Sequence, residues 1–281
     1  TGTQMNIPTA HIEGGDLTEG GALDDSVRHA MTKLAHIHFT TNQQARERLY
    51  RLGEEPWRIY NVGFSAIDLI VAGEFSSPSE LEEKYELTSE KPIIVFTQHS
   101  VTTEYEKAAG QVKPSLEALR ILAREGCQIV FTYPNNDAGG KRIIKEIKKL
   151  REEKLENVQI HQSLGRSDYH GILNLCGRKG RGVCVGNSSS GIKETPALGC
   201  PVVNIGPRQN GRLRGANVID VDYNTDAILN AARKALYDKD YRKKCRECKN
   251  PYGAGDAGGK ISDVLATIDI NLRLLQKKIT Y

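Results

Sequence analysis

The chain has 281 residues, of which 38% are apolar and 26% charged, so it can form both a packed core and a hydrated surface. This composition excludes collagen-like, low-complexity and fully disordered chains. The net charge of +4 comes from 39 basic and 35 acidic residues mixed along the sequence, so nucleic-acid binding is not indicated. No apolar run approaches the roughly 18 residues that a membrane-spanning helix needs, so no membrane partner is expected.

Short apolar runs alternate with amphipathic segments along almost the whole chain. Val27, Ala30, Met31 and Leu34, for example, repeat at the spacing of one helix face. Strands that alternate with helices in this way form parallel sheets covered on both faces, so the predicted fold class is α/β. Strands are expected at residues 7–12, 36–40, 59–62, 92–97, 128–132, 158–161, 182–185, 202–205 and 218–221.

A polar segment at residues 72–84 is the clearest linker in the sequence. It separates residues 1–75, which hold three expected strands, from residues 76–259, which hold enough strands for a complete doubly wound sheet. A closing helix is expected over residues 260–278, with an apolar stripe longer than the edge of one domain requires. We therefore expect residues 260–281 to cross back to the first domain.

The sequence holds six cysteines, and four of them lie inside apolar runs, where a cysteine usually behaves as a small buried hydrophobe. A chain of this length does not need disulfides, so a reducing, cytoplasmic compartment is expected. Cys245 and Cys248 form one C-x-x-C pair, but no second pair has the spacing of a zinc site. No metal site is therefore predicted.

The segment VCVGNSSSGIKETPALG combines a β-branched strand, a small polar turn and the beginning of a helix. Ligands of parallel α/β sheets bind outside the carboxyl ends of the strands, and free amides at a helix start bind phosphate. The turn offers Ser188, Ser189, Ser190 and Gly191 to a phosphate, and Glu194 is placed to accept hydrogen bonds from a ribose diol. The alternative is that a serine merely caps the helix and that Glu194 offsets the helix dipole.

Three other strand ends carry polar side chains that packing does not require. The turn IGPRQNGRLRG places Arg208 nearest to its strand, where it is the best candidate to hold phosphate. His99, in VFTQHS, is either a ligand or catalytic group or a turn residue, and the pattern alone slightly favours the turn. Asn135 follows another strand, and Asp137 is expected to cap the next helix.

Carboxylates mark the end of the first expected strand, in HIEGGDLTEGGALDDSVRH. Glu13 ends that strand before a glycine-rich loop, and Asp24 opens the next helix. Two carboxylates on the rims of one loop suit general acid–base catalysis. The alternative is structural, with Asp24 as a helix cap and Glu13 paired with Arg28, and the spacing alone favours neither.

Together these segments resemble the hydrolysing UDP-N-acetylglucosamine 2-epimerases of sialic-acid-type sugar biosynthesis. The resemblance rests on HIEGGD with DDSVRHAMTKLAH, QHSVTTEY, YPNNDAGG and GNSSSGIKETPALGCPVVNIGPRQ, which occur in the family's order from Pro8 to Arg208. It implies two Rossmann-like domains in a glycosyltransferase-B arrangement, with a UDP-sugar held between them. The first domain is then incomplete in this sequence, and residues 76–259 form the nucleotide-binding domain.

The resemblance also implies roles for individual residues. Ser188 and Ser189 would hold the diphosphate, and Glu194 would bind the ribose hydroxyls. The other positions that match the family's pattern are the catalytic carboxylates Glu13 and Asp24, the diphosphate-side His99, the nucleotide-side Arg208 and the cleft-lining Asn135. Base and acid are not assigned between the two carboxylates.

The implied reaction is an elimination followed by hydration. A base removes the C2 proton of UDP-N-acetylglucosamine while UDP leaves C1, and water then adds with inversion at C2, which gives N-acetylmannosamine and UDP. No cofactor and no metal are required, because amides and Arg208 can take the charge of the leaving group. A 4-amino sugar such as diacetylbacillosamine is equally compatible, and a homodimer or homotetramer is expected from the family.

Members of this family carry a further N-terminal segment with an acidic residue in a Gly-Asp-Arg-like loop, and nothing in this sequence matches it. We therefore expect the sequence to be an N-terminally truncated member, with turnover by this chain alone in doubt. The alternatives are a non-hydrolysing epimerase, which returns UDP to C1, a glycosyltransferase of the same fold, and an inactive fragment that binds nucleotide sugars. HIEGGD with DDSVRH resembles the hydrolysing type.

Overall fold

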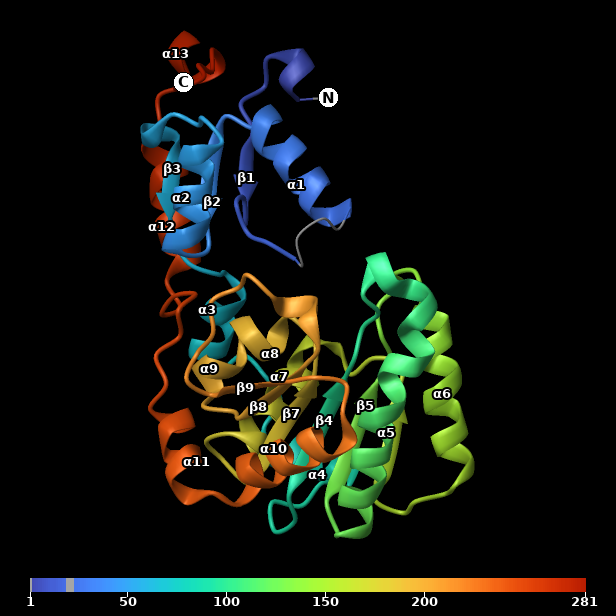
Figure 1. Ribbon diagram of the computed structural model, residues 1–281. Coiled ribbons are helices and arrows are strands. Elements are labelled where there is room, and N and C mark those ends of the chain that lie inside the picture. The colour runs from blue at the N-terminus through green and yellow to red at the C-terminus, as the bar shows by residue number, and fades with distance from the viewer. Residues whose placement is uncertain (1, 19–22) are drawn as a thin grey trace. The chain divides into compact units, whose positions relative to one another are not determined.

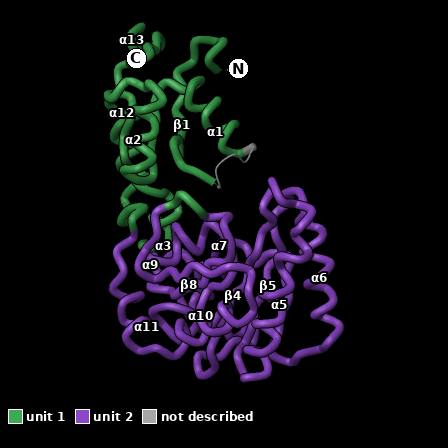
Figure 2. Tube along the Cα trace, viewed as in Figure 1, with its two compact units in different colours: residues 1–72, 210–212, 251–281 green, residues 73–209, 213–250 purple. Residues whose placement is uncertain are grey.

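The computed structural model describes residues 2–18 and 23–281 (Figure 1). The chain forms two compact units, shown in different colours in Figure 2. The first unit contains Thr1–Ala72, Asn210–Arg212 and Pro251–Tyr281, and the second contains Gly73–Gln209 and Leu213–Asn250. The return of the chain to the first unit, which we expected from residue 260, thus begins at Pro251.

The first unit is built on a three-stranded parallel sheet in the order β1-β2-β3. The buried side chains of Phe39, Val62 and Leu274 form part of its core, and Trp57 packs against them. The strands are β1 (Ala10–Ile12), β2 (Ile37–Thr40) and β3 (Ile59–Asn61), and the helices are α1 (Leu23–Leu34), α2 (Gln43–Arg51), α3 (Ala66–Val71), α12 (Ala257–Thr267) and α13 (Leu272–Leu275), with 3₁₀ turns at Thr3–Met5 and Pro56–Arg58.

Helix α1 forms where the apolar spacing predicts a helix, but the stripe that revealed it is largely exposed. Val27 and Met31 are each 49% exposed and Leu34 is 57% exposed. The period of the sequence therefore identified the helix correctly without identifying what the apolar side chains pack against.

The second unit is built on a six-stranded parallel sheet in the order β6-β5-β4-β7-β8-β9. The chain first winds outward from β4 to β6 and then returns to place β7 on the other side of β4. This reversal is the switch point at which doubly wound sheets bind their ligands. The strands are β4 (Ile93–Thr97), β5 (Gln128–Thr132), β6 (Val158–His161), β7 (Gly182–Gly186), β8 (Val202–Ile205) and β9 (Val218–Val221).

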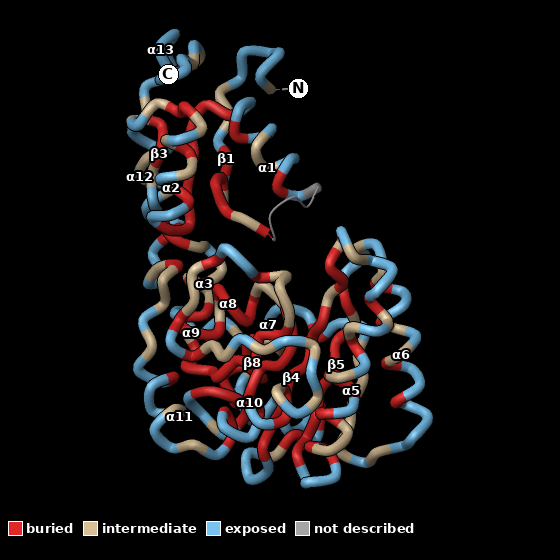
Figure 3. Tube along the Cα trace, in the orientation of Figure 1, coloured by how far each residue is buried: buried red, intermediate tan, exposed pale blue. Residues whose placement is uncertain are grey.

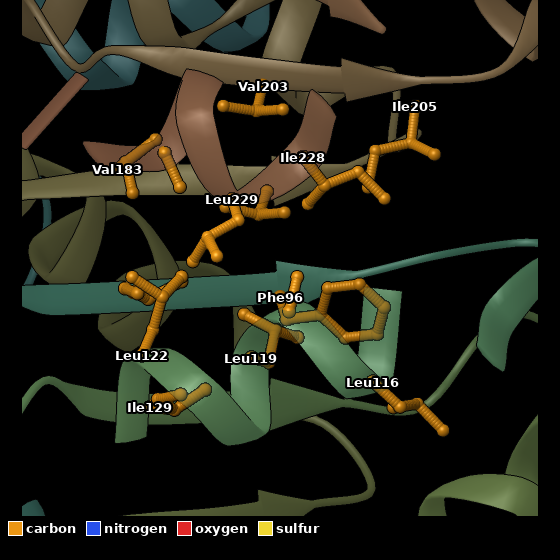
Figure 4. Close-up of a cluster of buried hydrophobic side chains, with 14 of the residues drawn as sticks. Phe96, Leu116, Leu119, Leu122, Ile129, Val183, Val203, Ile205, Ile228 and Leu229 are labelled. Carbon is orange, nitrogen blue, oxygen red and sulfur yellow. The ribbon is translucent and has the colours of Figure 1, made fainter. Parts of the chain in front are cut away.

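Helices cover both faces of this second sheet. On one face α5, α6 and α10 contribute to a single hydrophobic core, in which Phe96, Leu119, Val183 and Ile228 lie close together (Figure 4). On the other face α7 packs on β4 and β7. The four central strands are buried, the edge strands β6 (Val158–His161) and β9 (Val218–Val221) are only partly buried, and the outer turns of the helices are exposed (Figure 3). The helices are α4 (Pro78–Tyr85), α5 (Ala108–Arg124), α6 (Gly140–Glu152), α7 (Gly165–Cys176), α8 (Ser190–Lys193), α9 (Thr195–Leu198), α10 (Thr225–Tyr237) and α11 (Lys239–Arg246), with 3₁₀ turns at Thr102–Lys107 and Pro207–Gln209.

All nine expected strands are present, and the first is shorter than expected because it begins at Ala10. The predicted linker over residues 72–84 is wrong in its second half, where α4 begins at Pro78. The Ser77 side chain accepts a hydrogen bond from the Glu80 amide, and the Glu80 carboxylate accepts one from the Ser77 amide. This reciprocal capping box explains why a polar, proline-containing segment is helical.

The predicted closing helix over residues 260–278 is also wrong, because it is two helices. Helix α12 ends at Thr267, and Ile268 has an extended backbone with φ −75° and ψ 127°. Asn271 then caps α13 by accepting a hydrogen bond from the amide of Leu274 at 3.0 Å. Among the described residues no helix is long and apolar enough to cross a membrane.

Candidate functional site

The carboxyl ends of β4 and β7 lie side by side at the switch point of the second sheet. Thr97 pairs with Gly186 at the last position of the register. Gly186 has φ 131°, a conformation that side chains rarely adopt, and an added Cβ would overlap the carbonyl oxygen of Thr97. A glycine is therefore required for the serine turn to begin directly beside the end of β4.

Asn187 joins three strand ends. Its side-chain oxygen accepts a hydrogen bond from the His99 amide at 2.7 Å, and its side-chain nitrogen donates to the His99 carbonyl at 2.9 Å. Its own carbonyl accepts hydrogen bonds from Arg208 at 3.2 Å and from the side chain of Gln209 at 2.8 Å. The loops that follow β4, β7 and β8 are thus held together around one buried asparagine.

A pocket of about 430 Å³ opens beside these strand ends, entirely within the second unit. It brings together five of the residues that the sequence singled out, namely His99, Ser188, Ser189, Ser190 and Glu194. The other lining residues come from the ends of β4 and β5, from the loop after β6 and from α7; they are Thr97, Thr132, Tyr133, Gln162, Ser163, Leu164, Gly165, Arg166, Tyr169 and His170.

The three remaining predicted residues of the second unit lie around this pocket rather than in its lining. The amide of Asn135 donates to Nδ1 of His99 at 3.0 Å, and the Asn135 side chain donates to Asp137 at 2.7 Å. Arg208 lies 3.7 Å from the Asp137 carboxylate. Gly191 is buried, and a Cβ there would meet Val202 at 3.3 Å, so its small size serves packing.

The serine turn is not an ordinary helix cap. Helix α8 begins at Ser190 and ends after one turn, and the side chain of the preceding Ser189 makes no capping hydrogen bond. The hydroxyl oxygens of Ser188 and Ser190 lie 3.0 Å apart, and that of Ser190 lies 2.7 Å from the Tyr169 hydroxyl. The hydroxyls therefore form a chain whose Ser188 end lies in the pocket wall.

His99 is electrically neutral in this environment. Burial lowers the pKa of its imidazole from 6.5 to about 4, and the nearby charge of Arg208 adds to the effect. Because Nδ1 accepts the hydrogen bond from the Asn135 amide, the proton of the neutral ring is on Nε2. His99 thus presents a hydrogen-bond donor, which suits an anionic or carbonyl oxygen.

Glu194 lines the same pocket as the serines and lies at the junction of the short helices α8 and α9. Its carboxylate oxygen lies 2.8 Å from Nε2 of His170, a buried residue of α7. A carboxylate held on one side by a buried donor leaves its other oxygen available to hydroxyl groups of a ligand.

The two carboxylates predicted for acid–base catalysis lie in the first unit. Glu13 follows β1 and has a left-handed backbone with φ 67°, which is costly for a residue with a side chain and is typical of functional loops. Asp24 is exposed in the first turn of α1. Asp25, which the sequence reasoning passed over, is buried and accepts hydrogen bonds from the Thr18 amide at 2.9 Å and from Arg28 at 2.6 Å.

Arg212 provides a second ionic group in the first unit. Its guanidinium donates to the Leu17 carbonyl at 2.5 Å and to the Thr18 hydroxyl at 2.9 Å, and it lies 3.4 Å from the Asp16 carboxylate. Arg212 and Asp25 together therefore hold residues 16–18, which follow Glu13. All six cysteines are free thiols, and no group of three acidic, histidine or cysteine side chains suited to a metal occurs in residues 2–18 and 23–281.

Comparison with known proteins assigns the chain to a family. The family model described as UDP-N-acetylglucosamine 2-epimerase matches residues 1–266. The chain belongs to this family. It is 33% identical to the hydrolysing GDP/UDP-N,N'-diacetylbacillosamine 2-epimerase of Campylobacter jejuni over 85% of its length, and 33% identical to the hydrolysing UDP-N,N'-diacetylbacillosamine 2-epimerase of Legionella pneumophila over 97%. The chain spans 59% of the first relative and 68% of the second.

A solved structure of the family shares the fold of this epimerase-family chain. The crystal structure of the UDP-GlcNAc 2-epimerase of Neisseria meningitidis, bound to UDP-GlcNAc, superimposes with a TM-score of 0.75 at 18% identity. The superposition covers 95% of this chain and 72% of the other. The predicted fold class and the resemblance to the 2-epimerase family are thus confirmed.

Some residues of this epimerase-family site could not be singled out from the sequence. Asn187 and Gln209 flank the predicted serines and Arg208, so adjacency to the motifs was the available signal. Tyr169 and His170 carried no motif at all, because their importance arises only from the packing of α7 on β4 and β7.

Proposed function

We propose that this chain is part of a hydrolysing 2-epimerase of UDP-linked 2-acetamido sugars. It would convert UDP-N-acetylglucosamine, or its 4-acetamido relative UDP-N,N'-diacetylbacillosamine, and water into the free 2-epimer and UDP. The observation that carries the proposal is the pocket of the second unit, in which the neutral donor of His99, the serine hydroxyls and the Glu194 carboxylate line one cavity.

This arrangement matches the chemistry of a nucleoside diphosphate. The hydroxyls of Ser188 and Ser189 and Nε2–H of His99 can donate to diphosphate oxygens, and Glu194 can accept from a ribose diol. Arg208 adds positive charge behind the turn, because its guanidinium is held at the Asn187 carbonyl. Donors that are already in place stabilise the negative charge that develops as UDP leaves.

The reaction follows from these roles. A carboxylate, Glu13 or Asp24, removes the C2 proton, and the C1–O bond breaks with its electron pair leaving on UDP. Water then adds to C1 of the resulting glycal while a proton is delivered to the opposite face of C2. The left-handed backbone of Glu13 supports a functional role for this carboxylate.

The hydrolysing type is favoured because the two relatives at 33% identity carry that description in their names. The test is incubation of the protein with each UDP-sugar, followed by NMR of the sugar and measurement of released UDP. Free UDP and the free 2-epimer in equal amounts support the proposal. A UDP-linked epimer without release of UDP identifies the non-hydrolysing reaction, and turnover only with an acceptor sugar identifies a glycosyltransferase. UDP binding without turnover identifies a nucleotide-sugar-binding protein.

A further inference from the structure

Two consecutive residues of α7 contact different polar groups of the pocket. Tyr169 reaches the serine turn, because its hydroxyl lies 2.7 Å from the Ser190 hydroxyl. His170 reaches the carboxylate, with Nε2 lying 2.8 Å from Glu194. We propose that Tyr169 and His170 are positioning residues, which orient the phosphate-facing hydroxyls and the ribose-facing carboxylate respectively. This inference rests on the proposed function.

His170 holds Glu194 through one tautomer of its ring. The side chain of His170 is buried, and Nδ1 has no hydrogen-bond partner among the described residues. The ring therefore faces Glu194 with a proton on Nε2, since the tautomer with its proton on Nδ1 alone would bury a donor without an acceptor and leave no donor toward the carboxylate. Glu194 sits where two four-residue helices meet, so its own backbone offers little support for one rotamer. His170 supplies that support.

Tyr169 sets the direction in which a row of hydroxyls donates its hydrogen bonds. Tyr169, Ser190 and Ser188 form a row of hydroxyls, with 3.0 Å between the two serine oxygens. Each hydroxyl has one proton to donate. If Tyr169 donates to Ser190 and Ser190 donates to Ser188, the Ser188 proton is left to point into the pocket. An anionic phosphate selects this direction, because only then does Ser188 donate to it.

The roles of His170 and Tyr169 predict losses of affinity for different parts of UDP, so binding of three ligands distinguishes the two roles. UDP, 2′-deoxy-UDP and uridine are titrated against the unaltered protein by calorimetry, with NMR for the weak uridine complex. The ratio of the Kd values for 2′-deoxy-UDP and UDP reports the ribose hydroxyl. The ratio for uridine and UDP reports the diphosphate.

His170→Leu should weaken UDP binding about tenfold and bring the deoxy-UDP ratio close to one, while the uridine ratio stays the same. His170→Gln keeps a side-chain donor and should restore most of the deoxy-UDP ratio. Tyr169→Phe should lower the uridine ratio about threefold to tenfold and leave the deoxy-UDP ratio unchanged.

The matched control is Tyr85→Phe. The Tyr85 hydroxyl also anchors α7, through Asp168 at 2.6 Å, but it does not line the pocket, so neither ratio should change. Equal weakening of all three ligands in the α7 variants would show a merely structural role and overturn the inference. Unchanged ratios with normal UDP binding would overturn it while leaving the proposed function intact. Failure of the unaltered protein to bind UDP would overturn the proposed function itself, and the inference with it.

Discussion

The side chain of Asn187 forms two hydrogen bonds with the backbone of His99, accepting from its amide at 2.7 Å and donating to its carbonyl at 2.9 Å. The asparagine thus acts as one more residue of a strand pair, continuing the β4–β7 ladder beyond Thr97 and Gly186. Because it is 1% exposed, no water can replace these bonds readily if the side chain is removed.

The first prediction is that Asn187→Ala weakens UDP binding at least tenfold and lowers the free energy of unfolding by about 1–3 kcal/mol. Both effects arise because the His99 backbone and the serine turn lose their common support. Calorimetry with UDP and urea unfolding measure them. Asn157→Ala is the control, since its side chain also makes two hydrogen bonds to the backbone, by donating to two carbonyls, but lies outside the pocket lining. It should lose stability without losing affinity, and equal loss of affinity in both variants would contradict the assignment.

The second prediction concerns acid stability. Burial lowers the pKa of both His99 and His11 from 6.5 to about 4. The unfolded chain therefore takes up these two protons near pH 6.5, whereas the folded chain does not until about pH 4. The contribution of these two neutral histidines to the free energy of unfolding is fully present above pH 6.5. It is lost as the pH decreases from 6.5 to 4, by up to about 1.4 kcal/mol per pH unit for each histidine.

Thermal unfolding between pH 7 and pH 4.5 measures this slope. His99→Gln should flatten it, because the glutamine has no proton to take up in either state. The variant also provides an internal comparison, since His11 still titrates in it. A slope that is the same with and without His99 would show that its imidazole is not held neutral by the fold.

The positions of the strands were predictable because apolar, β-branched runs between helical periods leave few other structures. The contacts of the pocket were not, because they depend on register between distant segments. Asn187 and His99 are 88 positions apart in sequence, and nothing local indicates that the end of β7 will lie beside that of β4. Likewise, the choice between Asp24 and Asp25 as the buried carboxylate depends on the rotation of α1, which the apolar stripe did not determine.

The third prediction separates binding from turnover. Ser189→Ala combined with Arg208→Ala should weaken UDP binding about a hundredfold, because a hydroxyl donor and a nearby positive charge are both lost. Glu13→Gln should reduce turnover by at least about a hundredfold and leave the Kd for UDP nearly unchanged, since the amide keeps the shape but can act neither as the base nor as the acid. Steady-state UDP release and calorimetry make the comparison. If Glu13→Gln keeps most of its activity, the assigned chemistry is wrong.

The fourth prediction concerns the segment that returns to the first unit. Arg58 is fully buried, and its guanidinium donates hydrogen bonds to four backbone carbonyls, three of which belong to the returning segment. These carbonyls are those of His36 at 3.2 Å, Leu274 at 2.7 Å, Arg273 at 2.7 Å and Gln276 at 3.2 Å. Glu55 accepts a further bond at 2.7 Å and balances the charge.

Arg58→Ala should therefore release the returning segment and destabilise the first unit by about 3–5 kcal/mol, because buried carbonyls and a carboxylate lose their partner. Limited proteolysis with mass spectrometry should show new cleavage in residues 268–281. Arg166→Ala is the control, because Arg166 donates to the single carbonyl of Glu74 at an exposed site and should not alter cleavage. Resistance of residues 268–281 in the Arg58 variant would mean that apolar contacts such as those of Leu274 hold the segment by themselves.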